Sequence, residues 1–293
     1  MLALVFVPAL VSPTEAAAST WRGVPQVFHG QAFDTCSAPD SALLRAWRQS
    51  SPYGALGLYI GGGNRACSQP HLNRGYVHAA AAMGWRLLPL YVGAQAPCVT
   101  DAHARTSRIS SWKAFGQGQS DGQDAVRAAR SLGLAPGSPV YLDMEAYSRD
   151  RGKCSLAVLR YTTSWSRAVH AAGYLSGFYS SADSGVADLV SLAATGRGPA
   201  AEWRAGVDPA EAGQYREAGL TRAAQQVGAL PDVIWYARWD HRSSTDGYRA
   251  LGQSQWAGHH RVHQYVGNTT ESHGGRTAMI DRNAVDAPVA VVE

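Results

Sequence analysis

The sequence lacks several features that define common classes of protein. No run of Lys or Arg exceeds two residues and the net charge is only +4 over 293 residues, so a nucleic-acid-binding surface is not expected. No apolar run is long enough to span a membrane. Because internal repeats and low-complexity linkers are also missing, the simplest organisation is one domain that covers residues 19–293.

Motifs for cofactors, metals and nucleophiles are scarce as well. Residues 61–63 are all glycine, but neither GxGxxG nor a following Lys-Ser/Thr pair makes a nucleotide-binding loop. No GxSxG elbow is present. His259, His260 and His263 form HHxxH rather than HExxH, and there is no CxxC pair. We interpret these histidines, with His241 upstream, as polar loop residues, and expect no metal and no cofactor.

The first residues are typical of an exported protein. Residues 2–11 are apolar and residues 16–18 offer a small-residue cleavage site, which predicts a signal peptide over residues 1–18 although a basic n-region is missing. The alternative is the apolar N-terminus of a cytosolic protein. Because the mild positive charge fits an anionic neighbourhood such as a cell wall, we expect a secreted or cell-wall-associated protein with no membrane span after cleavage.

Short apolar runs alternate with amphipathic stretches along the chain. Hydrophobic residues make up 45% and charged residues 16%, which allows a large core. The candidate strands are 27–34, 55–61, 86–92, 139–145, 174–180, 232–239, 261–266 and 277–281. The candidate helices are 41–49, 72–83, 123–132 and 156–171. This order predicts an α/β fold, a single closed parallel (β/α)8 barrel of the TIM type, with an open doubly wound sheet as the main alternative. Long loops are expected after the third strand, over 93–120, and before the sixth, over 193–231.

The fourth candidate strand, in YLDMEAY, carries two acids on one face. Alternation places Asp143 and Glu145 on the side of Tyr141, toward the barrel interior, and the apolar residues between them on the helix side. The acids are then roughly 6–7 Å apart at the strand's C-terminal end, where barrel enzymes carry their active sites. Such a pair can hold one proton beside an anion, as glycosidic cleavage requires. The alternative is two exposed loop acids or acids paired with arginine.

Further acids close other strands, and aromatic residues gather at the same ends. Asp34 and Asp240 close strands 1 and 6 and Asp281 lies in strand 8. Each alone would also suit a helix cap or a turn, and Asp34 and Asp281 could hold the first and last strands together. Because sugar rings pack against aromatic rings, the aromatic residues at these ends are candidate substrate contacts, although core packing explains at least half of them equally well. The candidate substrate-binding residues are Tyr91, Tyr147, Tyr179, Tyr236, Trp239, Gln264, Tyr265 and Asp281.

The four cysteines fit an oxidising compartment because their number is even. Each lies just beyond the end of one of the first four strands, and neighbouring strand ends meet around one rim of a barrel. This predicts the disulfides Cys36–Cys67 and Cys98–Cys154. The alternative pairing of Cys67 with Cys98 would force Cys36 across to Cys154, which is farther.

The order of six short motifs resembles the glycoside hydrolase family 25 lysozymes, which are α/β barrels that cleave the glycan of peptidoglycan. The motifs are FDTC, VYLDMEAY, SGFYSS, WYARW, HQYVG and IDRN, within residues 28–283. A closer resemblance is to an exported actinobacterial family called glycoside-hydrolase-like, through FDTC, the glycines after strand 2 and the DxE strand. That family is implicated in cell-wall biology and its enzymatic activity is not established.

The resemblance implies roles for four acids. Glu145 would be the general acid, Asp143 would position the substrate's N-acetyl group or stabilise its charge, and Asp34 and Asp240 would support the pocket. The implied function is hydrolysis of an N-acetylated cell-wall polysaccharide such as peptidoglycan, by carboxylate acid/base or substrate-assisted catalysis. The alternative is a non-catalytic glycan-binding barrel. A phosphodiesterase barrel with paired histidines is disfavoured because His29 and Asp34 face opposite sides of the first strand.

Overall fold

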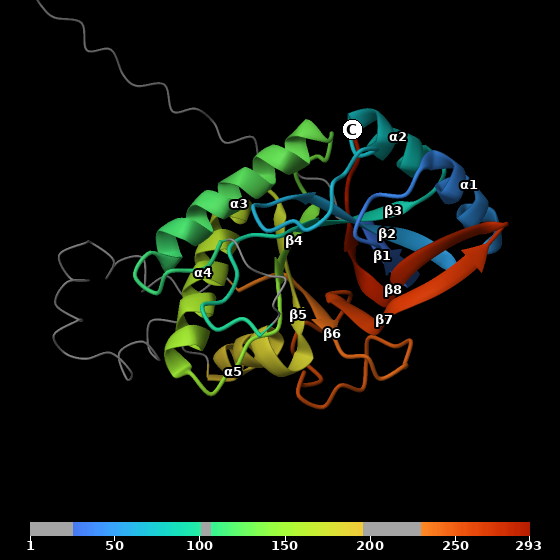
Figure 1. The fold of residues 1–293 in the computed structure, drawn as a ribbon. Helices are drawn as coiled ribbons and strands as arrows, with labels where there is room; N and C mark the ends of the chain where they lie inside the picture. The colour runs from blue at the N-terminus through green and yellow to red at the C-terminus, as the bar shows by residue number, and fades with distance from the viewer. Residues whose placement is uncertain (1–25, 101–106, 196–229) are drawn as a thin grey trace, which may run out of the picture.

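The computed structural model describes residues 26–100, 107–195 and 230–293. Eight strands in these residues form a closed barrel in chain order (Figure 1). They are β1 (Gln26–Asp34), β2 (Tyr53–Gly61), β3 (Arg86–Tyr91), β4 (Pro139–Met144), β5 (Leu175–Ser181), β6 (Val233–Ala237), β7 (Arg261–His273) and β8 (Arg276–Val289). The helices are α1 (Ser41–Ser50), α2 (Arg74–Ala82), α3 (Ala114–Ser131), α4 (Gly152–Ala171), the π-helical turn η1 (Ala182–Val186) and α5 (Ala187–Thr195). The predicted TIM-like α/β barrel is confirmed.

The last strand corrects the prediction of an all-parallel barrel. Strands β1 to β7 pair in parallel, whereas β8 runs antiparallel to both β7 and β1. The β7–β8 connection is a two-residue turn, Gly274-Gly275, in which both glycines have positive φ. No helix lies in the described connections after β6 and β7. Strands 1 and 8 pair and close the barrel as predicted.

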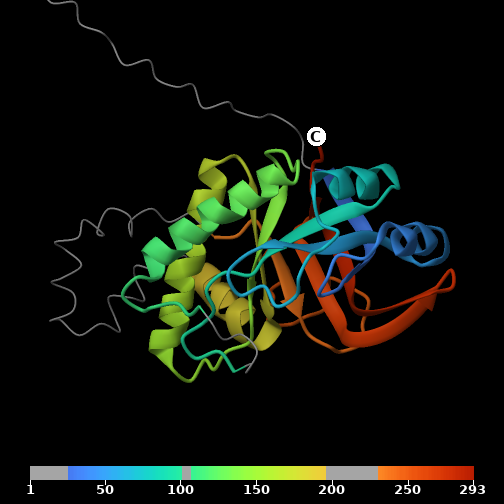
Figure 2. The ribbon, with the colours of Figure 1, turned by 45° about the horizontal axis from the view of Figure 1, so that its top comes forward.

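Local sequence explains where the helices begin and why they pack closely. Asp40 caps α1 because its side chain accepts the Leu43 N–H, and the helix begins at Ser41 as predicted. Helix α3 begins at Ala114, well before the predicted start at residue 123. The glycines in its first half weakened the helical pattern of the sequence. A Cβ on Gly118 would lie 2.2 Å from the Tyr161 carbonyl oxygen of α4. Glycine is therefore required for the close approach of α3 and α4, which lie side by side in Figure 2.

The apolar core has two layers, one inside the barrel and one between the barrel and the helices. Leu88, Tyr141, Trp235 and Val262 pack inside the barrel. Alternating residues such as Leu142 face the helices. The expected orientation of the β4 side chains is thus confirmed.

The two long connections are only partly described. After β3, residues 101–106 lie outside the described residues, and helix α3 begins at Ala114. Before β6, residues 196–229 lie outside them, as does the predicted signal peptide over residues 1–18. In the described part of the chain, no helix is both long enough and apolar enough to cross a membrane.

Candidate active site

Four acids meet at one end of the barrel. Asp34 ends β1, Asp143 lies on β4, Glu145 follows β4 directly and Asp281 lies on β8. All four line a cavity of about 480 Å³. Its walls come from the segments that follow β1, β2 and β3 and from the β7–β8 hairpin. The cavity therefore sits at the rim where the sequence predicted the site.

Asp34 is buried at the centre of a polar network. Its Oδ2 accepts hydrogen bonds from Asn283 Nδ2 at 2.8 Å and from Gln264 Nε2 at 3.4 Å, and its Oδ1 accepts from the Tyr59 hydroxyl at 3.3 Å. Burial raises the pKa of Asp34 well above the usual carboxyl range, and the nearby charge of Asp281 raises it further. The neutral acid is favoured at this position, so Asp34 is a hydrogen-bonding group of the cavity floor.

A glycine makes room for Asp34. A Cβ on Gly57 of β2 would lie 2.5 Å from the Asp34 Cβ, so a larger residue would push the carboxyl out of the barrel. Trp235 supports the same network from β6, because its Nε1 donates to Asn283 Oδ1 at 2.8 Å. Trp235 and Asn283 lie in the motifs WYARW and IDRN, but the sequence analysis gave neither a role, and it did not single out Tyr59. Asn283 lies two residues after Asp281 on the same strand, and that spacing was the available signal.

Asp143 is buried at the end of β4, beside Glu145. Burial raises the pKa of Asp143 well above its usual value, and the charges of Glu145 and then Asp34 raise it further. Its Oδ1 is buried and has no hydrogen-bond partner within the described residues. Asp143 lines the cavity, and one of its carboxyl oxygens is therefore buried without a partner at the cavity floor.

A buried glutamine fixes the end of β4 and was missed from the sequence. Gln95 donates through Nε2 to the Asp143 carbonyl oxygen at 2.9 Å and accepts the Glu145 N–H through Oε1 at 2.8 Å. These two bonds connect the loop after β3 to the backbone of both acids. Gln95 therefore fixes the backbone position of Glu145 relative to Asp143. The Glu145 side chain is half-buried.

Three of the predicted substrate residues form a group that contacts Asp34 through Gln264, and none of the three lines the cavity itself. Gln264 is buried and its Oε1 accepts from the Tyr179 hydroxyl and from Trp239 Nε1, each at 3.0 Å. The Trp239 side chain is 55% exposed, and its ring lies over Gly267, where a Cβ would approach it to 2.0 Å. Trp239 thus offers an exposed aromatic surface fixed to the same network.

Four other predicted aromatic residues face away from the barrel interior. The Tyr91 hydroxyl donates to Asp124, that of Tyr147 to Asp188, and that of Tyr265 to Gln31. Tyr236 stacks on His263, with ring centroids 4.3 Å apart. These four do not line the cavity, because the inward positions of their segments belong to alternating neighbours such as Trp235 and Gln264.

Asp240 lies apart from the other predicted acids. It follows β6, accepts the Arg242 N–H at 3.0 Å and pairs with Arg238 at 3.4 Å. It does not line the cavity. Asp240 also lies 3.6 Å from the ring of buried His263 on β7, so its contacts are on the β6–β7 side of the barrel and outside the cavity.

The histidines of the HHxxH motif contact separate partners, and His263 lies on β7 rather than in a loop as expected. His263 is buried with its ring nitrogens against the Ser244 and Arg238 carbonyl oxygens, and His259 contacts Asp286 at 2.6 Å. In the described ranges, no three His, Cys, Asp or Glu side chains are grouped to hold a metal ion.

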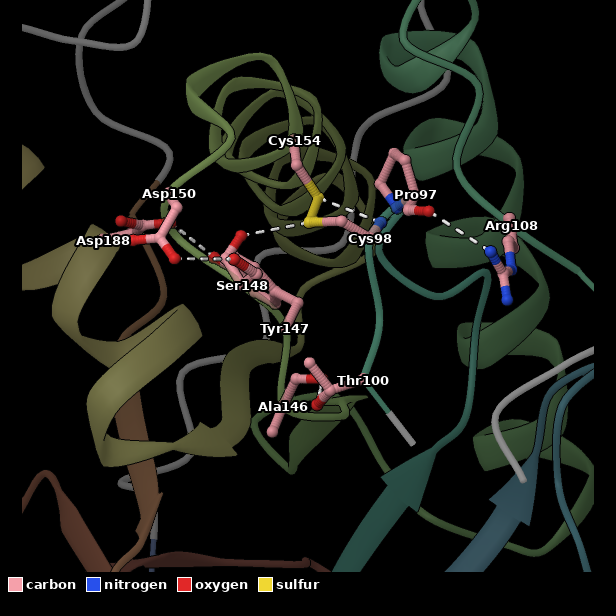
Figure 3. Close-up of a disulfide and its surroundings, with 10 residues drawn as sticks. All are labelled: Pro97, Cys98, Thr100, Arg108, Ala146, Tyr147, Ser148, Asp150, Cys154 and Asp188. Carbon is pink, nitrogen blue, oxygen red and sulfur yellow. Dashed lines mark hydrogen bonds between the residues drawn. A yellow bond between two sulfur atoms is a disulfide. The ribbon is translucent and has the colours of Figure 1, made fainter. Parts of the chain in front are cut away.

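Both predicted disulfides are confirmed. Cys36–Cys67 joins the segments after β1 and β2 and lines the cavity. Cys98–Cys154 joins the loop after β3 to the start of α4 (Figure 3). Beside it, the Thr100 N–H and hydroxyl both donate to the carbonyl oxygen of Ala146, the residue after Glu145. The second disulfide therefore holds the segment that follows the predicted general acid.

A closed barrel with acids clustered at one rim fits a glycoside hydrolase-like domain, and a family model makes that assignment. The family model described as "Rv2525c-like, glycoside hydrolase-like domain" matches residues 45–285. The chain belongs to this family. No curated protein is detectably similar to the chain.

Several solved structures resemble the barrel at low sequence identity. An uncharacterized B. stearothermophilus protein is 19% identical, with 87% of this chain and 95% of that chain covered and a TM-score of 0.47. The modular autolysin LytC from Streptococcus pneumoniae is 9% identical, with 89% of this chain covered and a TM-score of 0.48, and the chain spans 46% of its length. The muramidase from Acremonium alcalophilum is 14% identical, with 88% and 93% covered and a TM-score of 0.42. These similarities are too distant to bear on activity.

Proposed function

We propose that the protein hydrolyses glycosidic bonds of an N-acetylated cell-wall polysaccharide of the peptidoglycan type, outside the cytoplasm. One observation carries the proposal: the carboxyl of Asp143 lies beside Glu145 at the cavity floor with its Oδ1 unpaired. An acetamido N–H is a donor that suits this oxygen. The two disulfides support an oxidising compartment, and membership of a glycoside hydrolase-like family supports a glycan ligand.

The arrangement supports a substrate-assisted reaction. Burial favours the proton on Asp143 in the free protein. A substrate N–H bound to Asp143 stabilises its ionised form, so the proton shared by the pair moves to Glu145. Glu145 then donates this proton to the glycosidic oxygen while the acetamido oxygen attacks the anomeric carbon and the bond to the leaving sugar breaks. The attack of the acetamido oxygen closes a second ring at the anomeric carbon. Water then attacks the anomeric carbon, opens this ring and gives a proton to Glu145.

The remaining network explains how a sugar would be held. Gln264 and Asn283 fix Asp34, and a neutral Asp34 can donate to a hydroxyl of the ligand. The exposed ring of Trp239 can pack against the apolar face of a neighbouring sugar. Tyr91, Tyr147, Tyr236 and Tyr265 have no part in this proposal because their hydroxyls and rings are engaged elsewhere.

The test compares cleavage and binding in the same preparation. Glu145→Gln keeps the shape of the side chain and removes the proton, so loss of turbidity of purified cell walls should slow at least about a hundredfold, while glycan binding persists. Asp240→Asn is the matched control and should keep nearly full activity, because Asp240 lies outside the cavity.

Two results would count against the proposal. Full activity in Glu145→Gln would eliminate this mechanism. A wild-type protein that binds the glycan and never cleaves it would establish the alternative, a non-catalytic glycan-binding barrel that uses the same cavity.

A further inference from the structure

One cationic side chain lines a cavity that is otherwise acidic. Arg65, in the segment between β2 and α2, is the single Lys, Arg or His among the residues that line it, against four carboxyl groups. Its Nη1 donates to the Tyr59 carbonyl oxygen at 3.3 Å. Within the described residues, no carboxylate oxygen approaches its guanidinium to 4.0 Å. Arg65 is therefore not the direct counterion of the acids across the cavity.

The segment that carries Arg65 is fixed on both sides. The Asn64 side chain donates to the carbonyl oxygens of Gly93 at 2.8 Å and Ser107 at 2.7 Å, and it accepts the Ser107 N–H at 3.0 Å. Two residues after Arg65, the disulfide from Cys67 to Cys36 attaches the segment to the end of β1. These anchors hold the backbone of Arg65 in place before any ligand binds.

Arg65 is half-buried at the edge of this cavity, where its guanidinium can meet an anionic group of a ligand. A guanidinium has five N–H donors in a planar fork that matches a carboxylate, and the bond from Nη1 to the Tyr59 carbonyl oxygen uses one of them. The neutral forms favoured at Asp34 and Asp143 lower the negative charge that such a ligand would meet.

We propose that Arg65 binds a carboxylate carried by the glycan next to the bond that is cleaved, so that the substrate is an acidic N-acetylated glycan. This inference rests on the proposed function. Two sources share this chemistry: the lactyl carboxylate of a muramic acid free of peptide, and a uronic acid. In peptidoglycan the lactyl group is amide-linked to the stem peptide. The first source therefore requires that an amide-hydrolysing reaction supplies the substrate.

The experiment measures Kd for four oligosaccharides of equal length, using the Glu145→Gln background to prevent cleavage. They are a neutral N-acetylglucosamine oligomer, a peptide-free muramic acid glycan, the same glycan with its peptide, and an N-acetylglucosamine–uronic acid glycan. The protein should bind at least one acidic glycan about tenfold or more tightly than the neutral oligomer. Which acidic glycan binds best distinguishes the two sources.

Variants at Arg65 test the assignment. Arg65→Gln should remove the preference for the acidic glycan, weakening its binding about 10- to 100-fold and that of the neutral oligomer less than about threefold. Arg65→Lys should be intermediate, because it keeps the charge and loses the fork. The control is Arg127→Gln, at an exposed position on α3 where Arg127 pairs with Asp124. It should change neither the Kd for the acidic glycan nor the Kd for the neutral oligomer.

The outcomes separate this inference from the proposed function. Equal affinity of the parent for acidic and neutral glycans, or an equal loss for both in Arg65→Gln, would overturn the role of Arg65 and leave glycan hydrolysis standing. Binding of none of the four glycans would overturn both. An unchanged melting temperature in Arg65→Gln would show that a loss of binding is not a loss of folding.

Discussion

Asp143 is a buried carboxyl group whose raised pKa favours its protonated form in the folded protein. Its pKa is raised by burial and by the charges of Glu145 and Asp34, and the pKa values of Asp34 and Asp281 are also raised, with burial the largest cause in each. In the unfolded chain these acids release their protons near pH 4. From there up to the raised pKa values, the folded state binds more protons than the unfolded state, so stability from these groups falls as pH rises.

Asp143→Asn should therefore be more stable than the wild type at pH 7, with the difference shrinking toward pH 4. Asparagine has no proton to release and no charge to bury, and it retains nearly the same shape. The measurement is the free energy of unfolding by urea at several pH values between 4 and 8. The same variant should lose the glycan hydrolysis proposed above, and any residual activity should have its pH optimum shifted downward.

Asp150→Asn is the control for this prediction, because Asp150 is exposed outside the cavity. It should follow the pH dependence of the wild type. Equal stability of Asp143→Asn and wild type at every pH would contradict the idea that folding buries a neutral Asp143.

At the scale of single residues, the sequence predicted the positions of the acidic side chains better than their protonation states. Alternation along β4 placed Asp143 and Glu145 correctly because side-chain direction is a local property. The raised pKa of Asp143 comes first from burial, then from Glu145 and then from Asp34. Burial and the distance to Asp34, which lies more than a hundred residues earlier, depend on the assembled barrel and cannot be obtained from one strand alone. Alternation applied to β6 would also have turned Tyr236 outward once Trp235 was taken as the inward residue.

At the scale of elements, each disulfide has a separate task. Cys36–Cys67 closes 31 residues and shapes the cavity wall beside Arg65, whereas Cys98–Cys154 closes 56 residues and supports the segment after Glu145. Cys36→Ser/Cys67→Ser should mainly weaken glycan binding. Cys98→Ser/Cys154→Ser should mainly lower kcat, because the bonds from Thr100 to Ala146 lose their anchor.

Each pair of substitutions should also lower the free energy of unfolding by about 4 kcal/mol in the chain-entropy view, with the larger loss for the longer loop. Thermal melting and steady-state kinetics on the same samples separate the two effects. A change of binding and kcat by equal factors in both variants would show that the disulfides act only through stability.

The elements also show why strand direction was harder to predict than strand position. Cysteine pairing followed from the order of strand ends, which a barrel dictates. The direction of β8 cannot be predicted from its apolar alternation. The predicted strands over 261–266 and 277–281 also left an apparent connection of ten residues, which did not suggest a tight hairpin. The observed strands fill that gap up to Gly274-Gly275, and a Gly-Gly pair between two strands is a hairpin signal. That local signal was present in the sequence.

At the scale of the whole molecule, closure by β8 predicts one cooperative unit from about residue 24 to residue 285. β8 pairs with β1 and β7, so neither half of the chain contains a closed sheet of its own. Scanning calorimetry should give one transition whose calorimetric and van't Hoff enthalpies agree. Two stable fragments after limited proteolysis within residues 193–231 would instead show two domains.

The antiparallel β8 also has a consequence for the order of events during biosynthesis. Both disulfides join segments within the first 154 residues, so they can form while the second half of the barrel is still being made. The edge of β1 nevertheless stays without its partner until β8, the last strand, has emerged. Asp281 and Asn283 arrive with that strand. A nascent chain stopped short of β8 would therefore be oxidised yet expose an open sheet edge, and it would lack part of its own cavity floor.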